Sequence, residues 1–307
     1  MPFNGGRSQR SLRKRVRGAV LKSYVRSVFR SPLWDGRNVP SPRGRYGPST
    51  GPELPLLLLG DSSALTVGVL DTKDTFGAGL AHALATELSC TVNVRVQARA
   101  GVTTAGMARQ VRAVTGRTDQ GVALILIGGN DVMMPTSLHG SARQLGGYVR
   151  ELREAGWQVV VGSCADIGAA PAVRPGVAAV ATWRSHRLAR RQAAAALDAG
   201  AVVVSLTTDV FRRDPARLYC PDAFHPSPEG YAYYLQRLKV GVLEAGRTWK
   251  QGAASAAQGD IVVETADAAG HRVVAEMGAC FIPSPDRRQV VLRRYASDPV
   301  PAVVGQR

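Results

Sequence analysis

The sequence Gly60-Asp61-Ser62 follows an uncharged apolar run, Leu56 to Leu59, which is typical of a strand covered on both faces. Glycine permits a sharp turn, and aspartate and serine favour turns and helix starts. Open α/β sheets bind ligands at the carboxyl ends of their parallel strands, so we expect Ser62 at that rim. A serine hydroxyl placed there can attack a carbonyl once a base removes its proton. Ser62 is therefore our candidate nucleophile.

The candidate base is His225, which follows Asp222 by three residues, directly before the last helical stretch. At this spacing the carboxylate can reach the imidazole Nδ1–H and fix the tautomer whose Nε2 accepts a proton. Ser227 and Pro228 then suit the N-cap and the first residue of a helix. The alternative is a loop histidine that only orders the turn.

Two further turns follow predicted strands and could supply hydrogen-bond donors at the same rim. Gly101 ends Ala98-Arg-Ala-Gly, where a residue without Cβ lets a backbone N–H approach a substrate closely. Asn130 lies in Gly128-Gly-Asn-Asp and offers a side-chain amide. Taken alone, Gly101 is better explained by an ordinary turn, and the Asn130 motif is consistent with either interpretation.

Taken in order, Gly-Asp-Ser, Gly101, Gly-x-Asn-Asp and Asp-x-x-His resemble the four blocks of the SGNH (GDSL) hydrolase superfamily, over about residues 54–245. The resemblance implies that Ser62 is the nucleophile, His225 the general base and Asp222 the residue that orients it. It also implies an oxyanion hole formed by the backbone N–H groups of Ser62 and Gly101 and by the side chain of Asn130.

The chain departs from the family pattern in two places. Ser63 stands where the block that names the family has leucine, and Gln97 is the nearest amide where many members have an asparagine before Gly101. The run at 161–168 is similar to actinobacterial members of the superfamily. None of the predicted strands is followed by a Gly-x-Ser-x-Gly motif, which argues against an α/β-hydrolase.

The resemblance implies a carboxylic ester hydrolase, an esterase or lipase, that forms an acyl-enzyme on Ser62. Its substrate would be a small-molecule, lipid or glycan ester. An acyltransferase or deacetylase acting on a sugar or lipid would use the same triad. A third interpretation is an inactive protein that binds membrane or nucleic acid through a basic arm. We expect no cofactor, and the sequence shows no cluster of metal ligands.

From Leu54 onward, apolar runs rich in Val, Leu and Ile alternate with helical stretches. This alternation predicts βαβ units and a parallel sheet with helices on both faces. Five strands predict a three-layer α/β/α sandwich of the flavodoxin-like kind. The expected strands are 56–59, 92–96, 122–127, 157–162 and 201–205, and the expected helices are 75–89, 103–115, 141–155, 176–199 and 228–245.

The N-terminal 53 residues differ from the body in charge. They hold twelve Lys and Arg against two acidic residues, a balance of +10 out of +16 for the whole chain. Apolar residues within 12–30 recur at helical spacing, which predicts a basic amphipathic helix, and residues 36–53 are predicted to be a linker. This helix could dock on an anionic membrane surface, with nucleic acid a weaker candidate, or could simply pack on the body.

We expect a hydrolase domain at 54–246, between the arm at 1–53 and a linker with a C-terminal extension at 247–307. In this extension, 261–265 and 272–276 could form a hairpin, with a third strand at 289–295. Composition leaves open whether the extension packs on the body.

No apolar run approaches the roughly 20 residues of a membrane span, and Lys22 interrupts the run that a secretory signal would need. We therefore expect a cytoplasmic protein that is at most peripheral to a membrane. The four cysteines are sparse, so we expect buried free thiols, with a Cys164–Cys220 bridge as the alternative. The oligomeric state is left open.

Overall fold

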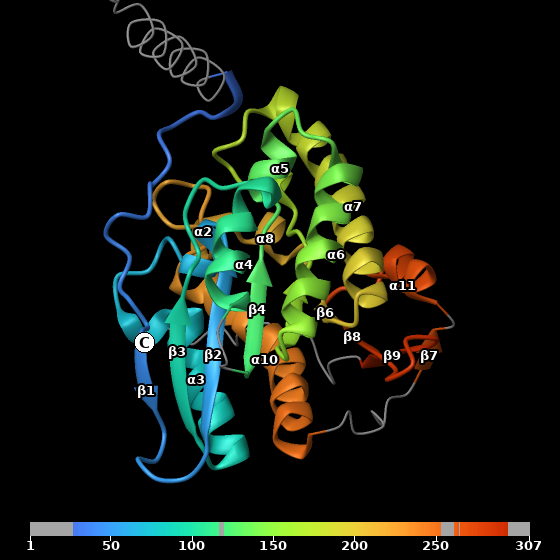
Figure 1. Ribbon diagram of the computed structural model, residues 1–307. Coiled ribbons are helices and arrows are strands. Elements are labelled where there is room, and N and C mark those ends of the chain that lie inside the picture. The colour runs from blue at the N-terminus through green and yellow to red at the C-terminus, as the bar shows by residue number, and fades with distance from the viewer. Residues whose placement is uncertain (1–26, 117–119, 253–260, 264, 294–307) are drawn as a thin grey trace, which may run out of the picture.

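A mixed sheet runs through the computed structural model, which describes residues 27–116, 120–252, 261–263 and 265–293 (Figure 1). Its nine described strands have the order β1-β3-β2-β4-β5-β6-β8-β9-β7. The middle five are parallel to one another, and their order, β3-β2-β4-β5-β6, is the flavodoxin-like order that the sequence predicts. These are β2 (Glu53–Gly60), β3 (Thr91–Val96), β4 (Val122–Leu126), β5 (Gln158–Gly162) and β6 (Val202–Val204).

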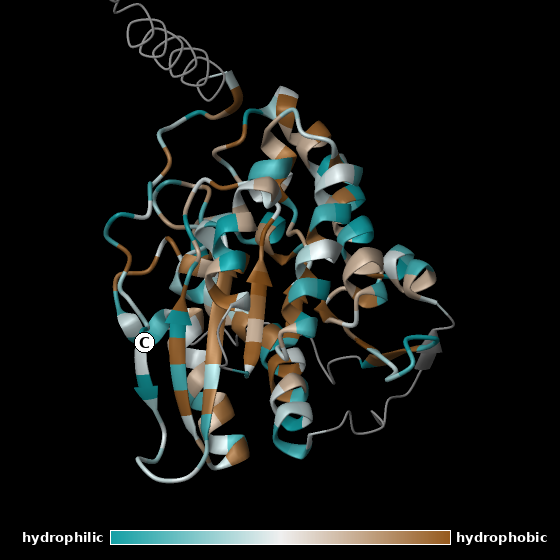
Figure 2. Ribbon diagram, in the orientation of Figure 1, coloured by the Kyte–Doolittle hydropathy of each residue, from teal (hydrophilic) through white to brown (hydrophobic). Residues whose placement is uncertain are grey.

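Helices cover both faces of the parallel strands, as the three-layer prediction requires. One face packs against α4 (Ala108–Thr115), α6 (Leu138–Glu154) and α7 (Pro175–Asp198), and the other against α3 (Phe76–Leu88) and α10 (Pro228–Gln251). In β2, Leu57 and Leu59 belong to the first layer and Leu56 and Leu58 to the second. A strand with two buried faces has no polar side, which explains why β2 is brown over much of its length in Figure 2.

Short helical turns follow the carboxyl ends of the parallel strands, so the rim that carries the candidate residues is built from them. The expected helix at 103–115 is divided into one such turn and α4. These elements are α2 (Ser62–Leu65), η1 (Thr72–Asp74), η2 (Thr104–Met107), α5 (Gly129–Met133), η3 (Ile167–Ala169), α8 (Val210–Arg213) and α9 (Pro215–Leu218).

An antiparallel strand extends the sheet beside β3, in the stretch expected to be a linker. β1 (Gly44–Tyr46) pairs with β3 across Gly44–Val94 and Tyr46–Val92. The Tyr46 ring also contacts His82 of α3 edge to face. Three residues are too few to show a strand periodicity in a Gly- and Pro-rich segment, and the linker prediction is therefore wrong at this point.

The C-terminal extension also differs from its prediction. Residues 266–272 form α11 (Ala266–Arg272), whose N-cap is Thr265, so the hairpin expected across them is wrong. The Ala-rich sequence and its cap favour a helix there. The observed hairpin is β8 (Cys280–Pro283) with β9 (Val290–Arg293), and β7 (Ile261–Val263) pairs with β9.

This extension continues the main sheet. β8 pairs antiparallel with β6, and α11 packs on α7 (Figure 1). α10 runs on to Gln251, so the expected domain boundary at 246 falls within a helix. The last 14 residues, including the end of the strand expected at 289–295, lie outside the described residues.

Most of the amphipathic helix expected at 12–30 lies outside the described residues. Within the described part, Val28 and Phe29 are buried against the body. None of the helices that the structure describes combines the length and the apolarity needed to cross a bilayer. All four cysteines are buried free thiols, as expected.

Candidate active site

Ser62 is the first residue of α2, just beyond the carboxyl end of β2. Asp61 caps this turn, because its Oδ1 accepts the Ser63 N–H at 2.9 Å. A Cβ on Gly60, whose φ is 131°, would lie 1.8 Å from the Leu126 carbonyl oxygen, so only glycine fits between β2 and β4. As the first helical residue, Ser62 has no carbonyl acceptor for its N–H within α2. The turn thus presents both the hydroxyl and the N–H of Ser62 at the rim.

Gln110 of α4 holds the end of β2 in place. Its Oε1 accepts the Gly60 N–H at 2.8 Å, and its Nε2 donates to the Gly60 carbonyl oxygen at 2.9 Å. The side chain is buried, so these two bonds satisfy groups that water does not reach. Sequence reasoning missed this residue, whose only signal is a polar position on the buried face of a helix.

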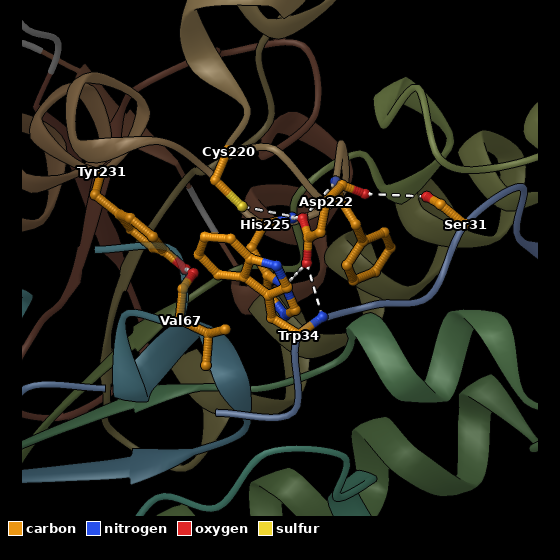
Figure 3. Close-up of polar contacts among 8 residues, drawn as sticks. Ser31, Trp34, Val67, Cys220, Asp222, His225 and Tyr231 are labelled. Carbon is orange, nitrogen blue, oxygen red and sulfur yellow. Dashed lines mark hydrogen bonds and ion pairs between the residues drawn. The ribbon is translucent and has the colours of Figure 1, made fainter. Parts of the chain in front are cut away.

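Asp222 and His225 form the hydrogen bond that their spacing predicts. Asp222 Oδ2 and His225 Nδ1 lie 2.7 Å apart, and both side chains are buried (Figure 3). A carboxylate only accepts, so Nδ1 carries the proton and Nε2 is free to accept one. Asp222 Oδ1 accepts the backbone N–H groups of Phe224 and His225, each at 2.9 Å, and the Cys220 thiol at 3.0 Å.

These donors decide the charge of Asp222. Burial acts to raise its pKa, but hydrogen bonds from the His225 ring, the Trp34 N–H and the Cys220 thiol outweigh burial and hold the pKa below its ordinary value. Asp222 is therefore a carboxylate at neutral pH. Burial and the bond to Asp222 raise the pKa of Cys220 to about 12, so its thiol stays protonated and donates.

A cavity of about 90 Å³ brings the candidate residues together. Ser62, Asn130 and His225 all line it. Much of its remaining wall is apolar or aromatic, formed by Phe76, Leu126, Ile127, Leu206, Phe211, Tyr219, Tyr231 and Tyr234. A carbonyl compound in this cavity would meet a hydroxyl, an imidazole and a side-chain amide.

Asn130, in α5, is tied to the loop that carries Gly101. Its Nδ2 donates to the Val102 carbonyl oxygen at 2.9 Å, which leaves the second N–H of the amide. The neighbouring Asp131 accepts the N–H and the hydroxyl of Thr104 at 2.9 and 3.0 Å. Gly101 has a φ of 78°, a conformation that favours glycine, but it is not among the described residues that line the cavity.

Three side chains or groups at this rim were not assigned a role from the sequence. Asp131 anchors the Gly101 loop, and Asp61 forms part of the cavity wall. Burial raises the pKa of Asp61 to about 6, although hydrogen bonds from Ser63 and the electrostatic interaction with His225 act to lower it. The third is the backbone N–H of Trp34, which donates to Asp222 Oδ2 at 3.0 Å. Both acids lie inside the motifs, so their position was a usable signal, whereas Trp34 gave none.

A second cavity, of about 400 Å³, lies beside the site. Residues 33–39 and 67–70 line it. Over the described ranges, no group of three or more His, Cys, Asp and Glu side chains is placed to hold a metal ion.

The sequence matches a known family over the segment that builds this site. Residues 58–233 match the GDSL-like Lipase/Acylhydrolase family. The chain is also 34% identical, over 195 residues, to a protein of Mycobacterium tuberculosis named as a GDSL-like esterase. This match covers 62% of each chain, so the chain spans less than two thirds of that relative's length.

Solved structures with low sequence identity are similar to this chain over about the same share of it. A lipase/acylhydrolase from Enterococcus faecalis is 19% identical, with a TM-score of 0.47, and the match covers 66% of this chain and 100% of that one. An acetylxylan esterase from Geobacillus stearothermophilus is 17% identical, with a TM-score of 0.48, covering 64% and 94%.

Proposed function

Because the chain belongs to the GDSL-like lipase/acylhydrolase family, we propose that it is a serine esterase that cleaves carboxylic esters through an acyl-enzyme on Ser62. The observation that carries this proposal is the buried Asp222–His225 hydrogen bond beside a cavity that Ser62 and His225 both line. A hydroxyl, a base and an acid that orients the base are the groups that nucleophilic acyl transfer requires.

In the proposed mechanism, His225 Nε2 removes the proton of the Ser62 hydroxyl as its oxygen attacks the ester carbonyl carbon. The carbonyl oxygen becomes negatively charged and accepts hydrogen bonds from the Ser62 N–H and from Asn130 Nδ2, which both belong to residues of the cavity wall. The N–H of Gly101, which lies outside that wall, is the third donor that the family resemblance implies. His225 then gives its proton to the alcohol oxygen, the carbon–oxygen bond breaks and the alcohol leaves. In the second half of the reaction a water molecule, deprotonated by His225, attacks the acyl carbonyl carbon. The bond from that carbon to the Ser62 oxygen then breaks, His225 returns its proton to this oxygen and the acid leaves.

The size of the cavity supports a short acyl group. An apolar cavity of about 150 Å³ is known to hold the six carbons of benzene. The cavity beside Ser62 measures about 90 Å³, which suits an acyl group of about two to four carbons. We therefore propose acetyl to butyryl esters as substrates, with the alcohol group left unspecified.

A chain-length series of p-nitrophenyl esters tests the proposal. We expect the acetate and butyrate to be hydrolysed at rates well above those of the octanoate, and Ser62→Ala to lower kcat by about a millionfold. Ser63→Ala is the matched control, because this neighbouring serine is exposed and lines the same cavity but has no role in the proposed mechanism, and the variant is expected to keep most of the wild-type activity.

Full activity of Ser62→Ala would refute the assignment of the nucleophile, and a preference for octanoate would refute the short acyl group. Adding sugar or lipid alcohols to the same assay separates hydrolysis from acyl transfer. An ester product that accumulates in place of the free acid would identify an acyltransferase.

A further inference from the structure

The N-terminal segment 27–39, here called the strap, lies against the loop that carries the acid and the base. The Arg30 N–H donates to the Ala172 carbonyl oxygen, and the Ala172 N–H donates to that of Ala223, both within 2.9 Å. The Phe29 ring meets Phe224 edge to face, with 5.2 Å between the ring centroids. The strap is thus packed directly on Phe224 and is joined to Ala223 through the backbone of Ala172.

The strap also lies close to two other segments of the rim. A Cβ on Gly36, whose φ is 74°, would lie 3.1 Å from the Ala100 Cβ and from Val67 Cγ2. Ala100 directly precedes the candidate donor Gly101, and Val67 closes the turn that begins at Ser62, because its N–H donates to the Ser62 carbonyl oxygen at 3.0 Å. One segment therefore contacts the loop that carries the acid and the base, and lies close to the loops that carry the nucleophile and one candidate donor.

The chemically significant contact is made by the backbone of Trp34. Its N–H donates to Asp222 Oδ2 at 3.0 Å, and the same oxygen accepts from His225 Nδ1 at 2.7 Å (Figure 3). The donors to Oδ1 all come from residues 220–225. Among the described contacts, Trp34 supplies the one donor to this carboxylate from outside its own loop.

We propose that Trp34 is a positioning residue, whose N–H holds the Asp222 carboxylate in the orientation that aligns His225, so that the strap is part of the catalytic site. The carboxylate can turn about its Cβ–Cγ bond, and donors on both oxygens hold it against that rotation. The bonds at Oδ1 act at one oxygen, and the Trp34 N–H holds the other, Oδ2, opposite Nδ1. This inference rests on the esterase function proposed above.

The backbone, and not the indole, carries this role. The Trp34 side chain is 40% exposed, so it contributes little to the core. A backbone donor is removed by proline and kept by alanine, which makes the two effects separable by substitution.

The test compares Trp34→Pro with Trp34→Ala in the full chain, with kcat and KM measured on p-nitrophenyl acetate. A hydrogen bond to a charged group is strong enough that its loss should lower kcat at least about tenfold in Trp34→Pro, with KM nearly unchanged. Trp34→Ala keeps the N–H and should stay within about threefold of wild type. Replacing Trp34 by indole-3-lactic acid, which exchanges only the N–H for an ester oxygen, should reproduce the proline result without restricting the backbone.

A proton NMR measurement provides a readout that does not depend on turnover. The His225 Nδ1–H, bonded to a carboxylate, is expected to give a low-field resonance that is retained in Trp34→Ala and shifts or broadens in the ester variant. Equal kcat for the alanine and ester variants, with this resonance unchanged, would overturn the role of Trp34. A wild-type protein without Ser62-dependent hydrolysis would overturn the esterase proposal instead, and the resonance would still decide whether the strap orients Asp222.

Discussion

Asn130 combines two tasks in one side-chain amide. One N–H holds the loop of Gly101 through the Val102 carbonyl oxygen, and the second is proposed to stabilise the oxyanion. Asp131 holds the same loop through Thr104, so the position of the loop does not depend on Asn130 alone. The two tasks can therefore be separated by substituting one anchor at a time.

We expect Asn130→Ala to lower kcat about 100- to 1000-fold with little change in KM, because the donor acts on charge that develops during the reaction. Thr104→Val removes the hydroxyl bond to Asp131 but leaves the Asn130 amide intact, and it is expected to lower kcat less than about tenfold. Steady-state kinetics on p-nitrophenyl acetate measures both. Equal losses in the two variants would mean that Asn130 acts only as an anchor of the loop.

At the scale of elements, β8 converts β6 from an edge strand into an interior one. Phe281 pairs with Val203 and Cys280 with Val204. The Phe281 side chain is fully buried in the core between the sheet and its helices. An uncovered edge would expose unpaired backbone groups, so these pairs both protect the sheet and enlarge its core.

Phe281→Ala should therefore destabilise the whole domain and not a separate appendage. We expect a loss of about 3–5 kcal/mol in the free energy of unfolding, typical of a large buried aromatic residue. Met277→Ala is the control, because Met277 is 51% exposed, and its effect should stay within about 0.5 kcal/mol.

Urea unfolding followed both by far-ultraviolet circular dichroism and by tryptophan fluorescence, to which the buried Trp157 contributes, measures these effects. Coincident transitions are expected if residues 279–293 belong to the hydrolase domain. Two separate transitions would instead support an independent unit after residue 246.

For the molecule as a whole, charge is divided between a basic N-terminal segment and a body that buries several acids. Residues 1–53 carry +10 of the net charge of +16. In the body, Asp131, Asp222 and Glu244 are buried with hydrogen-bond or ion-pair partners. Asp61 differs, because burial outweighs its bond to Ser63 and raises its pKa from 3.8 to about 6.

This shift predicts that stability depends on pH through Asp61. The folded state binds the Asp61 proton more tightly than the unfolded state does. The stabilisation that this proton gives the folded state is therefore complete below pH 3.8 and is lost as the pH rises through about 6. Between pH 4 and pH 7 the loss is on the order of 3 kcal/mol. The pKa of Asp222 is lowered, so its titration changes the free energy of unfolding only below this pH range.

Urea unfolding of wild type and Asp61→Asn at pH 4.5 and pH 7.5 measures this loss, because groups common to both proteins cancel in the difference. Wild type should lose stability relative to Asp61→Asn as the pH rises. The same pH dependence in both proteins would show that Asp61 does not titrate as its burial predicts.

The sequence by itself determined the features that depend on neighbouring residues or on a simple period. Apolar runs predicted the parallel strands, most clearly β2 and β4, because strands buried on both faces have no polar side. Gly60-Asp61-Ser62 predicted a turn at a strand end, and three residues between Asp222 and His225 were enough to predict their hydrogen bond. The Ser227 cap of α10 follows from equally local chemistry.

Only the tertiary structure decided the contacts between segments that are distant in the chain. Trp34 and Asp222 are 188 residues apart, and Gln110 reaches Gly60 from 50 residues away. Such bonds leave no period in the sequence, and every residue except proline has a backbone N–H, so nothing in residue 34 indicates which acceptor it meets. The pairing of β8 with β6 depends in the same way on where the body leaves an edge open. Local chemistry therefore predicts that Asp222 lies beside His225, whereas the contact between the strap and Asp222 is seen only in the folded structure.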